Sequence, residues 1–229
     1  MSKKIDRCTM DLHTLPQVDS MDIFIRLDND VDNILKEGCN FQEVYERAKA
    51  ALMFICQAND KNEDWRNSAL LRAGLNEFYS LEGAAKRDCK RNKIGVCPAR
   101  IRDSKNPLVH IMYLLRHATV HAQISRTRVH STSVISTLGG DAHEIELGAV
   151  ILDAPTIEQV LYCSEAKKHY DIDELTRAAE WIDDVQYNFG IGEVFRSGVS
   201  IYCRELLQSV GYKISPDDAP HASSGDAHV

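Results

Sequence analysis

Apolar residues recur every three or four positions along most of this chain, which places them on one side of a helix. A helix with one apolar side buries that side most simply by packing against other helices. The predicted helices cover residues 20–36, 40–59, 63–89, 107–124, 156–168, 171–189 and 193–210. We therefore expect a mainly α fold in which these helices share one core.

Two of these helices start with recognisable capping residues. Asn106 stands directly before Pro107, and asparagine is a preferred N-cap while proline suits the first helical position. Asn40 and Glu43 stand three residues apart, which is the spacing of a capping box. The sequence therefore predicts helix starts at both places.

One stretch of the chain departs from helical spacing. Residues 144–151 alternate between apolar and polar types, and residues 128–138 are rich in Val, Ile, Ser and Thr. Gly139, Gly140 and Asp141 separate the two runs and favour a turn. We expect a β-hairpin at about 128–152, inserted in the helical domain and followed by additional C-terminal helices.

The length of 229 residues is enough for one domain with a substantial core. We find no linker between two cores and predict a single domain over residues 20–213. Residues 1–19 are polar, contain Pro16 and are expected to form a flexible arm. Residues 214–229 are rich in Pro, Asp, Ser and Gly and are predicted to be disordered.

Composition limits the class of protein. The net charge is −7, which argues against a general nucleic-acid binder. The seven cysteines include no C-x-x-C pair, so free thiols in a reducing compartment are expected rather than a zinc ribbon. The first twenty residues lack the apolar core of a secretory signal, and no stretch approaches the roughly 18 continuous apolar residues of a membrane helix. We expect a cytoplasmic protein without membrane association.

Positive charge is concentrated between residues 86 and 102, where seven Lys and Arg residues accompany Asp88 as the only acid. Such a run is either a solvated helix face or a surface that contacts phosphate groups. The candidate RNA-binding residues are the first five of the run, Lys86, Arg87, Lys90, Arg91 and Lys93.

Arg116 and His121 lie near the end of the predicted helix 107–124. Five residues place them about 140° apart around the helix axis, although a long arginine can bend toward the histidine. Histidine exchanges a proton near neutral pH, and arginine presents a planar charged fork to phosphate. Doubled by a symmetric partner, this pair supplies what metal-free RNA cleavage needs: an acid, a base and positive charge beside phosphorus.

The string RHATVH, from Arg116 to His121, resembles the R-(polar)-x-x-x-H signature of the HEPN superfamily. The preceding segments are also similar to that family: a long helix with acidic residues (EFYSLEGA), a loop, and a helix that opens NPLVHIMYLLR. The resemblance covers residues 40–125. Some HEPN toxins carry a tyrosine two residues after the histidine, which a partner enzyme modifies. This chain has Gln123 there, which puts that mode of inhibition in doubt.

The resemblance implies a HEPN-like helical bundle that forms a homodimer and acts as a metal-independent endoribonuclease without a cofactor. Members act in toxin–antitoxin systems, phage defence or RNA processing, so an antitoxin or a defence protein is an expected partner. Carried over to this chain, Arg116 binds the scissile phosphate of RNA, His121 is the general acid or base, and His117 orients the pair. Glu82, in line with the buried stripe of its helix, matches a polar residue that some members hold there, and Glu77 is the other candidate.

Two other interpretations stay open. His110, His117 and His121 fall close to one helical stripe, and two histidines four residues apart can hold zinc, but no glutamate follows His117 as in H-E-x-x-H. Some HEPN members have lost catalysis, so the chain is alternatively a non-catalytic dimerising module that binds nucleotide or RNA.

Overall fold

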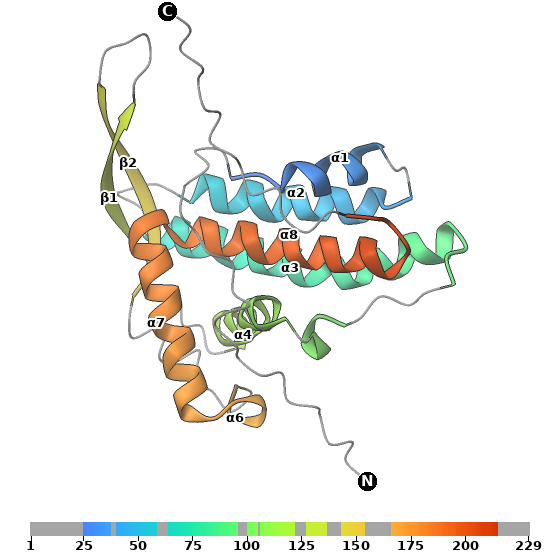
Figure 1. The fold of residues 1–229 in the computed structure, drawn as a ribbon. Coiled ribbons are helices and arrows are strands. Elements are labelled where there is room, and N and C mark those ends of the chain that lie inside the picture. Colours follow the sequence, from blue (N-terminus) through green and yellow to red (C-terminus); the bar gives the residue numbers. More distant parts are fainter. Residues whose placement is uncertain are drawn as a thin grey trace, which may run out of the picture.

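The computed structural model describes residues 25–37, 40–58, 64–95, 100–104, 106–121, 127–136, 143–153 and 166–214, without the side chains of 103, 120, 121 and 127–149. This part is mainly helical, with one antiparallel hairpin (Figure 1). Its elements are α1 (Asn29–Glu37), α2 (Gln42–Gln57), α3 (Asp64–Arg91), η2 (Ile101–Asp103), α4 (Pro107–His121), β1 (Thr127–Ser136), β2 (His143–Leu152), α6 (Ala166–His169), α7 (Ile172–Phe189) and α8 (Ile191–Ser209). No helix in the described ranges has the length and apolar character that a membrane crossing requires.

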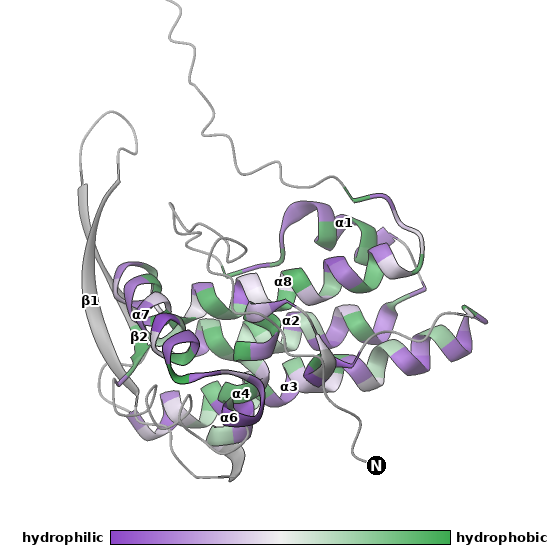
Figure 2. Ribbon diagram, turned by 60° about the horizontal axis from the view of Figure 1, so that its bottom comes forward, coloured by the Kyte–Doolittle hydropathy of each residue, from purple (hydrophilic) through white to green (hydrophobic). Residues whose placement is uncertain are grey.

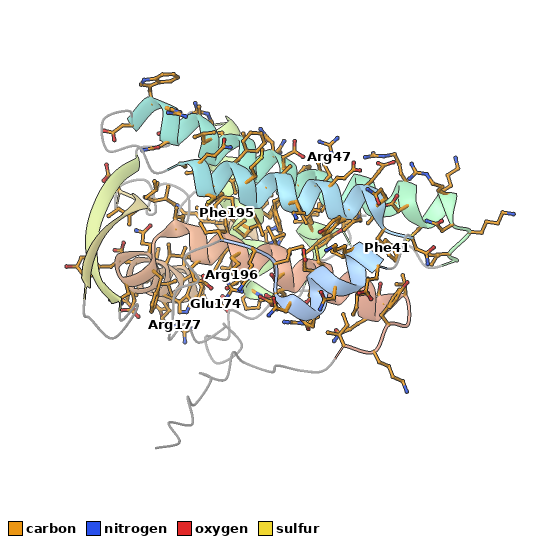
Figure 3. The ribbon with its side chains drawn as sticks, turned by 90° about the horizontal axis from the view of Figure 1, so that it is seen from above. Phe41, Arg47, Glu174, Arg177, Phe195 and Arg196 are labelled. Atoms are coloured by element: carbon orange, nitrogen blue, oxygen red, sulfur yellow. The ribbon has the colours of Figure 1, made fainter. Side chains whose placement is uncertain are left out.

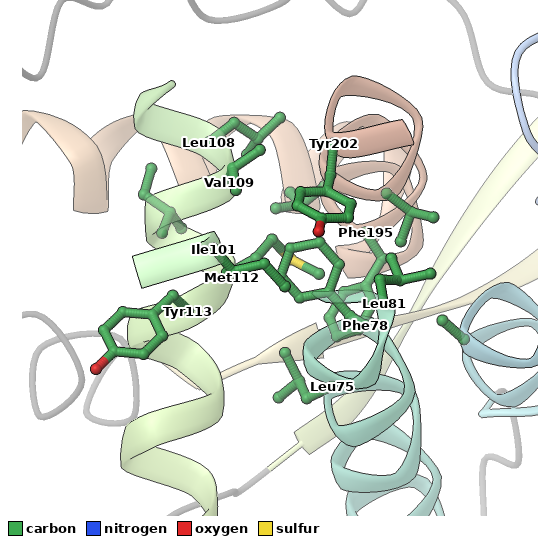
Figure 4. Close-up of a cluster of buried hydrophobic side chains, with 14 of the residues drawn as sticks. Leu75, Phe78, Leu81, Ile101, Leu108, Val109, Met112, Tyr113, Phe195 and Tyr202 are labelled. Atoms are coloured by element: carbon green, nitrogen blue, oxygen red, sulfur yellow. The ribbon is translucent and has the colours of Figure 1, made fainter. Parts of the chain in front are cut away.

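Four helices form the centre of the fold. Both α2 and α4 pack against α3 and α8. Figure 2 shows hydrophobic residues where these helices face one another and hydrophilic residues on their outer sides. Phe78 of α3, Met112 of α4 and Phe195 of α8 are fully buried and belong to the cluster drawn in Figure 4. The predicted mainly α fold with a shared core is therefore confirmed.

The helix α4 is buried on nearly every side rather than along one stripe. The Oδ1 atom of Asn106 accepts the N–H of Leu108 at 3.0 Å, which confirms the predicted cap. A helix that is apolar all round belongs in the interior of a protein. Among the α4 side chains that the structure describes, only Arg116 and His117 are partly exposed. The buried ones include Leu108, Val109, Ile111, Met112, Leu114, Leu115, Ala118 and Thr119.

The predicted capping box of Asn40 and Glu43 is wrong. The N-cap of α2 is Phe41, whose side chain makes no capping bond. The N–H of Val44 instead donates at 3.1 Å to Oδ2 of Asp88, which lies near the C-terminal end of α3. A carboxylate at a helix N-terminus satisfies free N–H groups and matches the positive end of the helix dipole. The cap of α2 is therefore supplied from a distant part of the chain.

The predicted helix 20–36 starts later than expected, because the described residues before α1 are not helical. The backbone N–H of Asp28 donates to Oγ of Ser200 at 3.2 Å, and its carboxylate bonds both Arg196 and Arg204 of α8. These bonds hold the segment against α8 in a non-helical form. The first residues of the predicted range lie outside the described part.

The two C-terminal helices match their predicted ranges to within two residues. Asp171 precedes α7, and its carboxylate accepts the N–H of Glu174 at 2.9 Å while the Glu174 carboxylate accepts the N–H of Asp171. Gly190 separates α7 from α8 with a φ of 78°, which glycine adopts without strain. Most of the predicted helix 156–168 lies outside the described residues, which include only its end, as the start of α6.

The predicted hairpin is confirmed: β1 and β2 pair antiparallel, with Thr127 opposite Leu152 and Ser136 opposite His143. Its turn lies outside the described residues. The helix α3 contacts β1, whereas α7 and α8 contact β2, so the hairpin is attached to the helical core. The predicted arm over residues 1–19 and the tail beyond residue 214 also lie outside the described part.

Candidate functional site around helix α4

Arg116 lies on the partly exposed side of α4 with its guanidinium over an aromatic ring. The Cζ atom is 4.3 Å from the ring centroid of Tyr79, a residue of α3. Its Nε is buried and meets no hydrogen-bond acceptor among the described residues. A guanidinium on an aromatic face is held by an attraction of about 0.5–2 kcal/mol and keeps its full charge.

No carboxylate in the described part of the chain neutralises Arg116. Other arginines differ in this respect: Arg87 bonds Glu43 at 2.6 Å, and Arg204 bonds Asp28 at 2.9 Å. A fixed carboxylate would occupy the N–H groups with which arginine binds phosphate. Arg116 is therefore a cation suited to an anion from outside the protein.

Aromatic rings continue from Tyr79 along α4. Tyr79 stacks on Tyr113 with the ring centroids 6.3 Å apart, and Tyr113 stacks on His110 with the centroids 5.5 Å apart. The ring of His117 is tilted by 41° to Tyr113 at 6.3 Å. Tyr113 is almost fully buried, and Figure 4 shows its ring on the side of α4 away from Phe78 and Phe195. An array of four rings thus adjoins the charge of Arg116.

His110 is buried and bonded inside the protein. Its Nδ1 lies 2.5 Å from the Tyr170 hydroxyl, and the ring of His169 meets it edge-on with the centroids 4.7 Å apart. These contacts attach α6 to α4. The described residues hold no group of three or more His, Cys, Asp or Glu placed to bind a metal ion. His121, the third histidine of the alternative zinc set, has its side chain outside the described part.

Among the predicted catalytic residues, Arg116 and His117 are neighbours in α4, and both are partly exposed. His121 is the last residue of that helix, and its side chain is not among those described. The distance between the Arg116 guanidinium and the His121 imidazole therefore stays a prediction.

Glu82 lies one turn after Tyr79 on α3, but its carboxylate is bonded to other parts of the protein. Its Oε1 accepts from Nζ of Lys86 at 2.5 Å, and its Oε2 accepts the N–H of Ile101 at 3.1 Å. The second bond attaches η2, the turn of helix that leads toward α4, to α3. Glu82 therefore supports the segment before α4, and no bond to Arg116 is among its described contacts.

The five predicted RNA-binding residues lie at the C-terminal end of α3 or just after it, and their charge is partly neutralised. Three of the five predicted RNA-binding residues are ion-paired, Lys86 to Glu82 and both arginines to Glu43. The two arginine hydrogen bonds lower the pKa of the Glu43 carboxyl below its ordinary value. Lys90 and Lys93 are exposed and have no acidic partner among the described residues. Exposed ion pairs contribute only about 0–1 kcal/mol, so phosphate groups can replace them.

The sequence reasoning missed both tyrosines of the site. Tyr113 stands three residues before Arg116, and Tyr79 stands three residues before Glu82, so each shares a helix face with a predicted residue. That spacing was a usable signal within each helix. It could not show that the two faces meet.

A second group of charges, between α8 and the segment before α1, was also missed. Arg196 of α8 (Figure 3) bonds Asp28 and the buried carboxylate of Glu193. Arg204 bonds Asp28 at 2.9 Å and Asp30 at 3.3 Å. Carboxylates outnumber arginines here, so this group has no spare positive charge for a ligand. Its role is to hold the N-terminal segment on α8.

Comparison of the chain with protein-family models, with curated proteins and with solved structures returned no match. The function of the site is therefore inferred from its geometry and from the sequence pattern.

Proposed function

We propose that this chain is a metal-independent endoribonuclease of the HEPN type, in which Arg116 binds the scissile phosphate and His121 transfers a proton. The observation that carries the proposal is the Arg116 guanidinium, stacked on Tyr79 without a neutralising carboxylate among the described residues. By contrast, Arg87, Arg196 and Arg204 are each paired with a carboxylate.

The contact with Tyr79 suits phosphate binding for a chemical reason. The Cζ atom lies 4.3 Å from the ring centroid, and an aromatic ring, unlike a carboxylate, does not occupy the N–H groups with which a guanidinium binds phosphate. Arginine held in this way can donate to two phosphate oxygens without first breaking an ion pair. Tyr79 would thus act as a positioning residue for Arg116, and His117 would orient the pair from the next position on α4.

The second half of the chemistry requires a proton donor and acceptor on opposite sides of phosphorus. One His121 supplies one of these roles at a time, so two copies related by a two-fold axis would supply both. We therefore propose a homodimer with RNA as its substrate. Lys90 and Lys93 are the leading contacts to the RNA backbone, since the other three predicted RNA-binding residues already have acidic partners. A toxin–antitoxin, phage-defence or stress role, with an antitoxin or defence protein as partner, belongs to the same proposal.

A non-catalytic RNA- or nucleotide-binding module is the second candidate. The ring array beside Arg116 favours it, because stacking and ion pairing hold a nucleotide without any proton transfer.

Cleavage of a labelled RNA by the purified full chain, with a metal chelator present, tests the proposal. Arg116→Ala should lower the cleavage rate by about 10²–10³-fold and His121→Ala by about 10²–10⁴-fold. Arg177→Ala is the matched control: it removes the same charge from the exposed face of α7 and should leave the rate unchanged. Tyr79→Leu should slow cleavage by about 2- to 30-fold, whereas Tyr79→Phe, which keeps the ring, should not.

The outcomes separate the candidates. RNA binding without turnover, lost in Arg116→Ala, would support the binding module. Cleavage that chelator abolishes would support a metal site. If Arg116→Ala behaves like Arg177→Ala in both cleavage and binding, the assignment of the site to α4 is wrong.

A further inference from the structure

On the outer edge of β2, the backbone groups of the last residue, Leu152, are bonded by a side chain of α7. The N–H of Leu152 donates to Oε1 of Gln186 at 2.8 Å, and Nε2 of Gln186 donates to the Leu152 carbonyl at 2.9 Å. Gln186 is buried, and its Nε2 also donates to Asp183. A side-chain amide presents both a donor and an acceptor to Leu152, as the backbone of a further strand would. The structure thus satisfies the outward groups of Leu152 internally.

The same two bonds define which backbone groups of β1 face outward. In an antiparallel pair, a residue turns both its N–H and its carbonyl either toward the partner strand or away from it, and the two states alternate. Leu152 turns its groups away from β1, so its register partner Thr127 turns its own groups away from β2. The alternation continues along β1. The outward-facing residues are therefore Thr127, Val129, Ser131, Ser133 and Ile135.

This outer edge of β1 has no strand paired with it in the described part of the chain, where the sheet consists of β1 and β2 alone. The helix α3 contacts β1 without closing that edge by strand pairing. Natural edge strands are usually protected by lysine, proline or short length. Here the edge strand has ten residues, lacks Lys and Pro, and carries Arg128 as its one Lys, Arg, Asp or Glu residue. A two-stranded hairpin is also only marginally stable without further strands or packing.

We propose that β1 pairs with β1 of a second copy of this chain, in antiparallel register about a two-fold axis at Thr132. The two hairpins then form one four-stranded sheet with both β2 strands outside. In this register the outward groups of Val129 meet those of the partner's Ile135, and Ser131 meets the partner's Ser133. Every outward-facing residue from 129 to 135 finds another outward-facing residue, as continuous hydrogen bonding requires.

The side-chain types favour a second copy as the occupant of this edge. Val129 beside the partner's Ile135 is a pair of β-branched residues, which is a favourable cross-strand combination. Arg128 meets the partner's Ser136, so no like charges are opposed. The edge of β2 suits self-pairing less well, for two reasons. That strand carries Glu144 and Glu146, and the outward groups of Leu152 are already bonded to Gln186 of α7.

Removal of one outward N–H tests the pairing. Ser133→Pro deletes an N–H that the hairpin itself does not use, whereas Ser133→Ala keeps it. Light scattering over a range of concentrations should find a dimer for the natural chain and for Ser133→Ala, and a monomer for Ser133→Pro. Circular dichroism should give the same helical content for all three. A monomeric natural chain at every concentration, or an unchanged dimer in Ser133→Pro, would overturn the inference.

A crosslink tests the register without relying on a proline. Residues 132 of the two copies would face each other as a non-hydrogen-bonded pair with their Cα atoms about 4.5 Å apart, within disulfide range. Thr132→Cys should therefore form a covalent dimer under mild oxidation, with the introduced thiols joined in peptide mapping. Ser131→Cys is the matched control, because residues 131 of the two copies would be about 8 Å apart, beyond disulfide range. Equal crosslinking of both variants would contradict the register.

This inference does not rest on the RNA chemistry, because its tests measure the mass of the assembly and not cleavage. Arg116→Ala should remain dimeric even where it abolishes cleavage. If Ser133→Pro stays dimeric and still cleaves RNA, the β1 interface is wrong and the proposed function is retained.

Discussion

Asp88 illustrates how one buried carboxylate serves two elements of this fold. It is fully buried in α3, accepts the N–H of Val44 at the start of α2, and bonds Arg91 at 3.1 Å. Burial raises the pKa of the Asp88 carboxyl above its ordinary value of 3.8, although the bonds from α2 and the charge of Arg91 oppose this. The side chain is therefore needed as an acceptor more than as a charge.

Substitution of Asp88 separates these two roles. Asp88→Ala leaves a helix-start N–H without its acceptor and should lower the free energy of unfolding by about 1–3 kcal/mol. Asp88→Asn keeps the accepting oxygen and should lower it by less than about 1 kcal/mol. Urea unfolding near neutral pH measures both values. Equal losses in the two variants would show that the charge of Asp88, and not its oxygen, stabilises α2.

The raised pKa also sets the sign of a pH effect. Folded Asp88 holds its proton more tightly than unfolded Asp88, so its contribution to stability is complete below pH 3.8 and decreases as pH rises through the folded pKa. The free energy of unfolding of the natural chain should therefore fall with pH across this window more steeply than that of Asp88→Asn.

Among the elements, α4 and α8 approach each other closely because one of them presents a glycine. A Cβ atom added to Gly198 of α8 would lie 2.7 Å from Cγ of Met112 in α4. The same addition at Gly83 of α3 would meet only the flexible end of Arg87, at 3.3 Å. These two helical glycines thus differ in what a methyl group would displace.

This difference predicts opposite effects of the same substitution. Gly198→Ala should lower the free energy of unfolding by about 1–2 kcal/mol, since repacking of Met112 outweighs the gain in helix propensity. Gly83→Ala should raise it by about 0.5–1 kcal/mol, since the propensity gain is not opposed. Thermal unfolding of both variants measures the contrast. A stabilising effect at Gly198 would mean that α4 and α8 pack less tightly than described.

In the whole molecule, the N-terminal and C-terminal segments of the described chain are joined by Asp28. Its carboxylate lies between Arg196 and Arg204 of α8, and its backbone N–H reaches Ser200 between them. These three α8 residues are spaced by four and so share one helix face. A single aspartate therefore attaches α1 and the residues before it to the last helix.

Loss of this carboxylate charge should loosen the N-terminal segment. Asp28→Asn leaves two partly buried arginines without their shared counter-charge and should lower the free energy of unfolding by about 1–3 kcal/mol. Hydrogen exchange should quicken in residues 25–37 and stay unchanged in α3. Asp32→Asn in α1 is the control, because Asp32 has no described ion pair. Equal exchange in both variants would contradict this role of Asp28.

Much of the secondary structure was predictable because its causes are local. Asn106 and Pro107 mark the start of α4 through groups within three residues of each other, and the alternation around Ile145 marks β2 through its immediate neighbours. The Arg116-to-His121 motif is likewise a property of one helix. Its expected function, however, depends on what surrounds that helix.

The features that sequence reasoning missed all join residues far apart in the chain. Tyr79 lies beside Arg116, Asp88 caps α2, and Gln186 bonds the outward backbone groups of Leu152 in β2. A periodic pattern tells which face of a helix is apolar, but it carries no information on which other face will meet it. The helices and hairpin thus follow from short-range propensity, whereas the free charge at Arg116 exists because packing placed an aromatic ring there instead of a carboxylate.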